Sequence, residues 1–268
     1  MDLGTARWMV SADAEPALAA AAAEPDPGSL AAGERLRRLT SPERAAAVLT
    51  QVALRRKASG KFGDRAATLF LTKDGLEQAT RADVARWRAG RFAAAGATRV
   101  VDLGCGIGAD ALAFVAAGLE VVAVEADPVT AALAEANLGR PVLVADATEV
   151  APGLLADDSA VFLDPARRTS TGRTWRVEDL SPPWAFSTGL LGGRVGCIKA
   201  APGLPSGFIP ADVAAVWVSH GGDLVETSLW SGDGVPGSRT ALLLPSGDRL
   251  DAGTRAEPPV GPPARYLY

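Results

Sequence analysis

A glycine-rich turn preceded by an acid is the first feature of this sequence that could do chemistry. The run Asp102-Leu103-Gly104-Cys105-Gly106-Ile107-Gly108 follows an apolar stretch and leads into a segment with helical spacing. Glycines let such a turn bring its backbone close to a ligand. Dinucleotide enzymes use similar turns, but their spacing is Gly-x-Gly-x-x-Gly, and a carboxylate at Asp102 would repel a pyrophosphate. The turn therefore favours a nucleoside-type ligand that carries positive charge.

Three more acids stand where the next strands are expected to end. Glu125 follows Asp102 by 23 positions, and Asp146 and Asp164 close two further apolar runs. Because an open α/β sheet binds ligands at the carboxyl ends of its strands, the four acids should meet at one edge. Glu125 can accept both hydroxyls of a ribose, and Asp146 can accept from an adenine amine while Ala147 donates its backbone N–H. The alternative for Asp146 is a helix N-cap.

The loop and the acids together predict a site for S-adenosylmethionine, which has no phosphate and carries a sulfonium and an ammonium. The expected cofactor-binding residues are Asp102, Gly104, Cys105, Gly106, Gly108, Glu125, Ala126, Asp146, Ala147 and Asp164. Methyl transfer mainly needs alignment of the reacting atoms, and proximity can supply about 7–11 kcal/mol. A dedicated base is optional, so Asp164 is expected to orient the nucleophile and could accept its proton.

The loop resembles motif I of class I S-adenosylmethionine-dependent methyltransferases, and the three later acids fall at the subsequent acidic motifs of that class. A narrower resemblance is to a bacterial methyltransferase family that carries a C-terminal THUMP-like domain, and it rests on Leu71–Thr80, Arg88–Phe92 and Asp164–Arg168. That domain would begin about where this chain stops. The resemblance therefore implies a truncated form.

The resemblance also bears on the methyl acceptor, through Asp164-Pro165-Ala166-Arg167. Amino-directed nucleic-acid methyltransferases carry an acid or amide, two prolines and an aromatic there, which hold the target nitrogen and stack on a flipped base. Here Ala166 replaces the second proline and Arg167 the aromatic, although an arginine plane can also stack. The expected catalytic residues are Asp164, Pro165 and Arg167. Arg167 could instead hold a phosphate or pair with a neighbouring acid.

Other reactive side chains fit catalysis less well. His220 lies in a predicted turn, where a lone histidine is more often structural, and Lys199 closes a strand, where a lysine is usually solvated. Covalent attack on a pyrimidine needs a cysteine at the cleft, but Cys105 belongs to the loop and Cys197 to a strand. With one histidine and two cysteines, the chain offers no metal-ligand cluster and no disulfide framework.

The elements that position these residues are predicted from the sequence pattern after Gly96, where short apolar runs alternate with segments of helical spacing. Strands are expected at about 98–103, 120–125, 141–145, 159–163 and 194–199, and helices at about 109–117, 128–138 and 175–190. Residues 213–219 and 224–230 flank a Gly-Gly turn and predict a hairpin. The expected fold is a Rossmann-like α/β domain with a seven-stranded, mostly parallel sheet and a terminal antiparallel hairpin.

The first 93 residues predict a small helical domain. They are rich in Ala, Leu and Arg, with helix breaks expected near Ser59-Gly60 and Phe62-Gly63. Thr80 and Asp83 resemble a capping box that starts a helix, one face of which should pack on the α/β domain. The predicted domains are helical residues 1–93, a methyltransferase domain over 94–256 and a proline-rich linker over 257–268.

Charge divides the chain and leaves the acceptor open. Between Arg35 and Arg91 there are 14 Lys/Arg and 5 Asp/Glu, a balance of +9, whereas the whole chain has a net charge of −4. The basic stretch could attract RNA, which makes methylation of an RNA base or amino nitrogen the first hypothesis. A solvated arginine-rich surface is the simpler explanation. The acidic pI of about 5.2 favours a small molecule or a protein side chain as acceptor, with the N-terminal helices forming a lid over the cleft.

A third hypothesis is a module that binds the cofactor without turnover, because the Asp164 motif is incomplete. The start Met1-Asp2-Leu3-Gly4 has no basic leader, and no apolar run is long enough to cross a bilayer. A cytoplasmic protein without metal is therefore expected, and its oligomeric state stays open.

Overall fold

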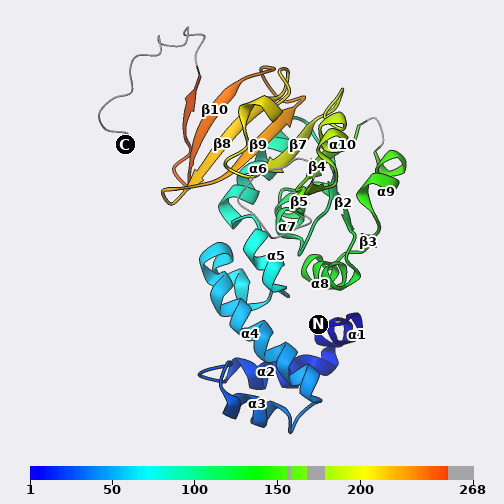
Figure 1. Cartoon of the computed structure of the whole chain (residues 1–268), viewed down its shortest axis with the longest axis vertical. Helices are drawn as coiled ribbons and strands as arrows, with labels where there is room; N and C mark the ends of the chain where they lie inside the picture. The colour runs from blue at the N-terminus through cyan, green and yellow to red at the C-terminus, as the bar shows by residue number, and fades with distance from the viewer. Residues whose placement is uncertain (156–157, 168–178, 253–268) are drawn as a thin grey trace.

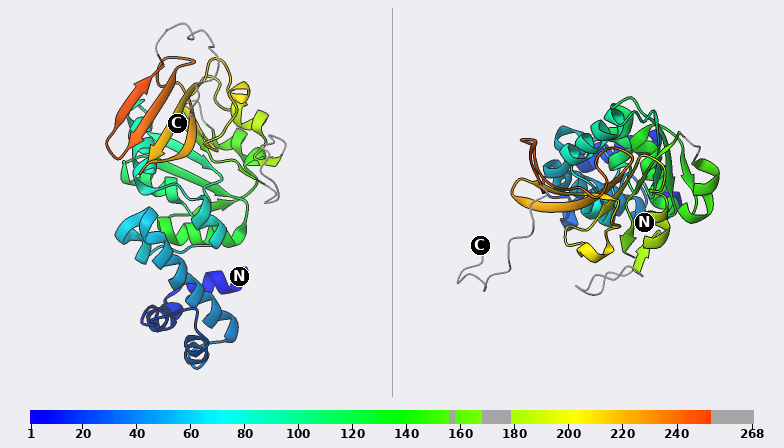
Figure 2. Two further views of the ribbon diagram at one scale, coloured as in Figure 1. Left: turned by 60° about the vertical axis from the view of Figure 1, so that its left-hand side comes forward. Right: turned by 90° about the horizontal axis from the view of Figure 1, so that it is seen from above.

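The chain forms a helical N-terminal part and an α/β part built on one large sheet (Figure 1). The computed structural model describes residues 1–155, 158–167 and 179–252. The predicted linker over 257–268 lies outside these residues. Figures 1 and 2 show helices α1 to α4 extending away from the α/β part on the side where α8 lies.

A nine-stranded sheet in the order β11-β10-β8-β9-β7-β4-β1-β2-β3 forms the centre of the α/β part. Its strands are β1 (Arg99–Leu103), β2 (Glu120–Glu125), β3 (Val142–Val144), β4 (Ala160–Leu163), β7 (Gly196–Ala200), β8 (Ala214–His220), β9 (Asp223–Ser231), β10 (Arg239–Leu244) and β11 (Asp248–Asp251). The five strands expected to be parallel are parallel neighbours, and β8 and β9 form the expected hairpin. Elsewhere β5 (Ala166–Arg167) pairs with β6 (Leu180–Ser181).

The prediction of seven strands is wrong, because β10 adds in parallel to β8 and β11 adds antiparallel to β10. The β8–β9 hairpin therefore lies inside the sheet, with β9 between β7 and β8. All four residues of β11 are exposed. A short strand with no buried face lacks the alternation by which a strand is detected in a sequence.

Helices α7 (Ala109–Ala116) and α8 (Pro128–Leu138) come after β1 and β2 as expected. Helix α9 (Ala147–Leu154) was not expected, because Pro152 and Gly153 in its last turn hide its pattern. The expected helix over 175–190 is wrong for residues 180–183, which the structure describes and which are not helical. Helix α10 covers only Trp184–Gly189, since Pro182 and Pro183 come directly after β6 and a residue before proline disfavours helix.

The helical part is organised around the 21-residue helix α4. Its helices are α1 (Leu3–Met9), α2 (Glu15–Ala22), α3 (Leu30–Leu36), α4 (Pro42–Phe62), α5 (Lys73–Gln78) and α6 (Ala82–Ala94), with 3-10 turns η1 (Ala12–Ala14) and η2 (Gly63–Ala67). The expected break near Ser59-Gly60 is wrong, because α4 continues to Phe62 and ends at Gly63, whose φ of 56° suits glycine.

The helical part meets the α/β part through three buried clusters. Val84 and Phe92 of α6 lie in the core on one face of the sheet, which confirms that this helix packs on the α/β domain. Ala6 and Met9 of α1 pack on Leu133 of α8. The end of α4 and the start of α5 pack against Ile107 of the glycine loop and Leu112 of α7. Helix α6 is thus fixed on a face of the sheet, whereas α1, α4 and α5 are fixed beside α8 and the glycine loop, which follow the carboxyl ends of β2 and β1.

Among the residues described, none of the helices combines the length and apolar character needed to cross a bilayer.

Candidate functional site

The glycine loop comes directly after β1 and is held against the end of β2. Gly104, Gly106 and Gly108 have φ values of 95°, 56° and 85°, which side chains rarely tolerate, so the loop needs glycine at all three positions. The backbone N–H groups of Gly104 and Cys105 each donate to the Val124 carbonyl at 2.9 Å. This places the loop beside the acid that ends β2.

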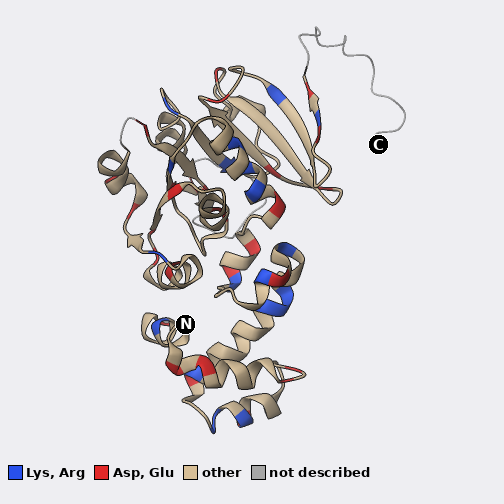
Figure 3. Ribbon diagram, turned by 180° about the vertical axis from the view of Figure 1, so that it is seen from behind, with Lys and Arg blue, Asp and Glu red and all other residues tan. Residues whose placement is uncertain are grey.

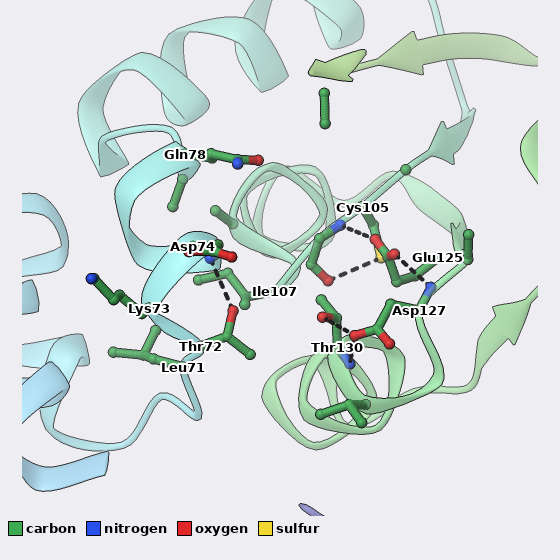
Figure 4. Close-up of a pocket in the computed structure, with 18 of the residues that line it drawn as sticks. Leu71, Thr72, Lys73, Asp74, Gln78, Cys105, Ile107, Glu125, Asp127 and Thr130 are labelled. Atoms are coloured by element: carbon green, nitrogen blue, oxygen red, sulfur yellow. Dashed lines mark hydrogen bonds between the residues drawn. The ribbon is translucent and has the colours of Figure 1, made fainter. Parts of the chain in front are cut away.

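Glu125 fixes the same loop through its carboxylate (Figure 4). Its Oε2 accepts from the Gly106 N–H at 2.9 Å, and its Oε1 accepts from the Asp127 N–H at 2.9 Å. Each oxygen keeps acceptor capacity, since a carboxylate offers about four lone-pair sites. Glu125 is therefore oriented in advance and can still accept a pair of hydroxyls.

Asp102 lies beneath the loop with 0% of its surface exposed. Neither carboxylate oxygen has a hydrogen-bond partner among the residues described. Burial, together with repulsion from Asp110 and Asp164, raises the pKa of the Asp102 carboxyl well above its usual value. A buried acid without a partner is costly unless a cation or donor compensates it. The ammonium of S-adenosylmethionine has the charge and donors that this position lacks, so the residues present fit that cofactor.

Asp146 has a structural role that the sequence left as an alternative. Its Oδ1 accepts from the Thr148 N–H at 2.8 Å and from the Thr148 hydroxyl at 2.6 Å, and it caps helix α9. The N-cap interpretation is confirmed. Contact of Asp146 and Ala147 with adenine stays a prediction, and both residues line the same cleft as Glu125.

A cleft of about 980 Å³ runs between the strand ends and the N-terminal helices. In Figure 4, Glu125, Asp127 and Thr130 lie on one side, and Lys73, Asp74 and Gln78 on the other. Pockets for one small ligand typically have about 300–1,000 Å³, so this cleft has room for a cofactor and an acceptor group. Of the predicted residues it exposes Gly104, Cys105, Gly106, Glu125, Ala126, Asp146, Ala147 and Asp164.

The second wall of the cleft comes from α1, α4 and α5, which belong to the N-terminal helices expected from the sequence either to hold RNA or to form a lid over the cleft. Gly75 of α5 explains the close approach to the loop: a Cβ there would lie 2.5 Å from Cγ2 of Ile107 and 2.6 Å from Oγ1 of Thr72. Thr72 also caps α5, accepting from the Gly75 N–H at 2.9 Å. The segment Leu71–Thr80, which carries part of the family resemblance, is therefore a wall of the cleft.

Asp164 lies at the end of β4 and is bound by Lys199. The Lys199 Nζ donates to Asp164 Oδ2 at 2.6 Å and to the Gln78 carbonyl at 2.9 Å. The expectation of a solvated lysine is wrong, because only 13% of the Lys199 side chain is exposed. Burial raises the pKa of Asp164, and the Lys199 ammonium opposes that rise.

The other two predicted catalytic residues are Pro165 and Arg167. Pro165 is half-buried and does not line the cleft, whereas Asp164 and Ala166 do. The backbone of Arg167 pairs with Leu180, and its side chain lies outside the description, as does Arg168. The roles of Pro165 and Arg167 stay predictions.

A buried charge network lies behind the cleft. Arg88 has 0% exposure and pairs with both Asp110, in the first turn of α7, and Glu226 of β9. Burial alone would lower the pKa of Arg88, but the two carboxylates outweigh it and raise that pKa well above normal. The Thr80 hydroxyl donates to Asp110 Oδ2 at 2.6 Å. Thr80 thus does not cap α6, whose N-cap is Arg81 without a side-chain bond.

The basic stretch from Arg35 to Arg91 is not gathered at the cleft. Figure 3 shows Lys and Arg spread along the helical part and α6. Several of them form ion pairs with acids of the same chain, such as Arg35 with Glu24 and Arg91 with Asp233. Among the described residues that line the cleft, Lys73 is the only lysine or arginine. The acids that line it are Asp2, Glu43, Asp74, Asp110, Glu125, Asp127, Asp146 and Asp164.

The remaining reactive groups lie elsewhere or are unreactive. His220 does not line the cleft and pairs through Nε2 with Asp83 at 3.0 Å. Cys105 lines it, but burial raises the pKa of its thiol well above normal, which opposes the thiolate form. In the part of the chain that the structure describes, no group of three or more potential ligands could hold a metal ion.

The sheet order and the glycine loop after β1 define a Rossmann-like α/β fold. A crystal structure of a candidate methyltransferase from Porphyromonas gingivalis W83 shares this fold, with a TM-score of 0.63 and 23% identity over 86% of this chain and 62% of that one.

At the sequence level, an uncharacterised S-adenosylmethionine-dependent methyltransferase of Mycobacterium tuberculosis, found in strains CDC 1551 and H37Rv, is 33% identical over 223 residues. The match covers 78% of this chain and 60% of that protein, so the chain spans less than two thirds of these curated relatives. A family model described as a domain of unknown function, DUF8688, matches residues 2–58, which run from α1 into α4.

Proposed function

We propose that this chain is an S-adenosylmethionine-dependent methyltransferase whose cofactor lies in the cleft, against the carboxyl ends of β1, β2 and β3. The observation that carries this proposal is the buried Asp102, which has no partner among the described residues and lies beneath a loop that needs three glycines. The shared fold and the names of the curated relatives support it.

When bound, the cofactor would supply a methyl group that is activated by its sulfonium. The residues around the cleft would bind and orient it. Asp102, which does not line the cleft, would attract the ammonium from beneath the loop through its charge, and Glu125 would accept from the ribose hydroxyls. Lys73 is available for the carboxylate, as the one basic residue among the described lining residues. The α5 wall and α1 would exclude water and hold the reacting atoms in line.

The acceptor that the cleft favours is a nitrogen group of a small molecule or protein side chain. Eight acids and one lysine line the cleft in the described part of the chain. This negative lining attracts cations and repels phosphates. Asp164, open to the cleft with 32% of its side chain exposed, can accept an N–H from such an acceptor.

RNA is the second candidate, because Asp164-Pro165 comes directly after β4 at the position used by amino-directed nucleic-acid methyltransferases. The resemblance to the family with a THUMP-like domain favours it as well. A base would then enter the cleft while its phosphates stay outside the acidic lining.

The cofactor assignment is tested by calorimetry with S-adenosylhomocysteine. We expect the wild-type chain to bind it and Asp102→Ala to weaken binding by about 1.5–3 kcal/mol, the value of a charge-assisted hydrogen bond. Wild-type chain that does not bind the compound, or Asp102→Ala with unchanged affinity, would refute the assignment.

The acceptor is tested by labelled methyl transfer from S-adenosylmethionine to two pools, a fraction of metabolites and proteins and a fraction of total RNA, each with wild type and Asp164→Ala. Label in the first pool that depends on Asp164 supports the main proposal. Label in RNA alone supports the second candidate. Cofactor binding without label in either pool favours a module that binds but does not turn over.

A further inference from the structure

The carboxyl end of α5 is held by two lysines from distant elements. Helix α5 has six residues, so its last carbonyls find few partners within the helix. The Nζ of Lys61, from α4, donates to three of them, and the Nζ of Lys199, from β7, donates to the fourth at 2.9 Å. The carbonyls bound by Lys61 are those of Leu76, Glu77 and Ala79, at 2.7, 2.8 and 3.0 Å. We call Lys61 and Lys199 the lysine clamp.

Only one member of the clamp also reaches the acid at the acceptor end. Lys199 donates to Asp164 Oδ2 at 2.6 Å, whereas Lys61 has no bond to Asp164 within the described structure. The described residues provide no hydrogen bond to Asp164 Oδ1. Since Asp164 lines the cleft, the oxygen that Lys199 leaves available can accept a hydrogen bond from a bound molecule.

The charged groups around the Lys199–Asp164 pair make the Lys199 ammonium important for the protonation state of Asp164. The groups that face the pair are Asp102, Asp110 and Glu226, which are acidic, and Arg88 and Lys61, which are basic. Burial and the neighbouring Asp110 raise the pKa of Asp164, while Lys199 and Arg88 oppose that rise. Without the ammonium, Asp164 would hold a proton more readily and would donate where it should accept.

We propose that Lys199 is a positioning residue for methyl transfer, which holds Asp164 as a carboxylate with Oδ1 available to the cleft and ties the α5 wall to the same point. This inference rests on the proposed methyltransferase function. A carboxylate paired with an ammonium is a weak base but a good hydrogen-bond acceptor. The arrangement therefore selects an acceptor nitrogen that bears an N–H and is neutral at the moment of transfer. Its lone pair would form the bond to the methyl carbon as the carbon–sulfur bond breaks, S-adenosylhomocysteine would leave, and the extra proton on nitrogen would pass to solvent. A hydroxyl, which would need deprotonation first, is disfavoured.

Lys61 provides a matched control, because it holds the same helix end without touching Asp164. The experiment monitors the Asp164 carboxyl by carbon-13 NMR titration in wild type, Lys199→Met, Lys199→Arg and Lys61→Met, with Asp164→Asn to assign the signal. We expect Lys199→Met to raise the Asp164 pKa by about 1–3 pH units, the usual effect of losing a nearby opposite charge. Lys199→Arg should restore most of the shift, and Lys61→Met should leave the titration near that of wild type.

Two results would overturn the positioning role. One is an Asp164 titration in Lys199→Met that matches wild type, and the other is an equal shift in Lys61→Met, which would reduce Lys199 to a helix cap. If mass spectrometry locates the transferred methyl group on an oxygen of the acceptor, the proposal that the site selects a nitrogen is overturned. Binding of S-adenosylhomocysteine, measured on the Lys199 and Lys61 variants, should stay within about threefold of wild type. Failure of the wild type to bind would refute the methyltransferase proposal and leave the Asp164 titration as a separate result.

Discussion

The two ends of the cleft are built in different ways. At the cofactor end, the glycine loop, Glu125 and Asp146 come from three consecutive strand-helix units and are fixed by bonds within one unit or between consecutive units. At the acceptor end, Lys199 of β7 binds both Asp164 and the Gln78 carbonyl of α5, three residues that lie far apart in the chain. The first end can be recognised from local motifs, and the second exists only once distant elements pack together. This difference explains why a cofactor can be proposed with more detail than an acceptor.

The largest expected effect tests how far the acceptor end depends on buried charge. Arg88→Met should lower the free energy of unfolding by about 3–5 kcal/mol, because Asp110 and Glu226 would both remain buried without their cation. Arg86→Met, on the same helix with 75% of its side chain exposed, should change stability little. Denaturant unfolding measures both variants. Equal stability of the two variants would show that the buried network is not needed for folding.

A smaller effect, confined to binding, is expected at the cofactor end. Glu125→Ala should weaken S-adenosylhomocysteine by about 1.5–3 kcal/mol, since it removes the proposed ribose acceptor and frees the Gly106 N–H. Glu120→Ala, at the opposite end of the same strand, is the control and should bind like wild type. Calorimetry distinguishes them, and equal affinities for the two variants would place the ribose elsewhere.

The pH dependence of S-adenosylhomocysteine binding tests the protonation state of Asp102 at the cofactor end. Because the pKa of Asp102 is raised in the free protein, the carboxyl carries a proton below that pKa, whereas the ligand ammonium requires the carboxylate. Binding should release this proton, so affinity should rise with pH, by at most about tenfold per unit, and level off above the raised pKa. Asp102→Asn should abolish the slope in calorimetry across buffers. A wild-type slope that persists in Asp102→Asn would assign the proton to another group.

The smallest effect is expected at Asp146, where unfolding separates the contribution of the cap's hydrogen bond from that of the negative charge. Asp146→Ala should cost about 1 kcal/mol of stability, because the Thr148 N–H loses its acceptor, and Asp146→Asn should retain most of it, since asparagine also caps helices. Thermal and denaturant unfolding compare the two variants. Equal losses would mean that the negative charge, rather than the cap, stabilises α9.

Local patterns predicted much of the α/β part. The strands β1, β2 and β4 and the helices α7 and α8 lie where apolar runs and helical spacing placed them, because each is a regular element with a buried face. Two of the elements that were missed lack such a pattern, since β11 is exposed throughout and α9 ends in Pro152-Gly153. Strand β10 was also missed, although buried residues alternate along part of it. Three of the predicted site residues, Asp102, Gly108 and Pro165, are not among the described residues that line the cleft, and the side chain of Arg167 lies outside the described structure.

The sequence by itself determined the glycine loop, the order of strands and helices along the first units of the sheet, and the acids that end those strands. These features depend on neighbours within one element or one turn, which are adjacent in the chain. The tertiary structure alone decided that α1, α4 and α5 form the second wall of the cleft, that Arg88 is fully buried, and that Lys199 binds Asp164 instead of water. Those pairings join residues more than thirty positions apart or depend on burial, and neither is set by local spacing, because only the packed elements fix which charges lose their water.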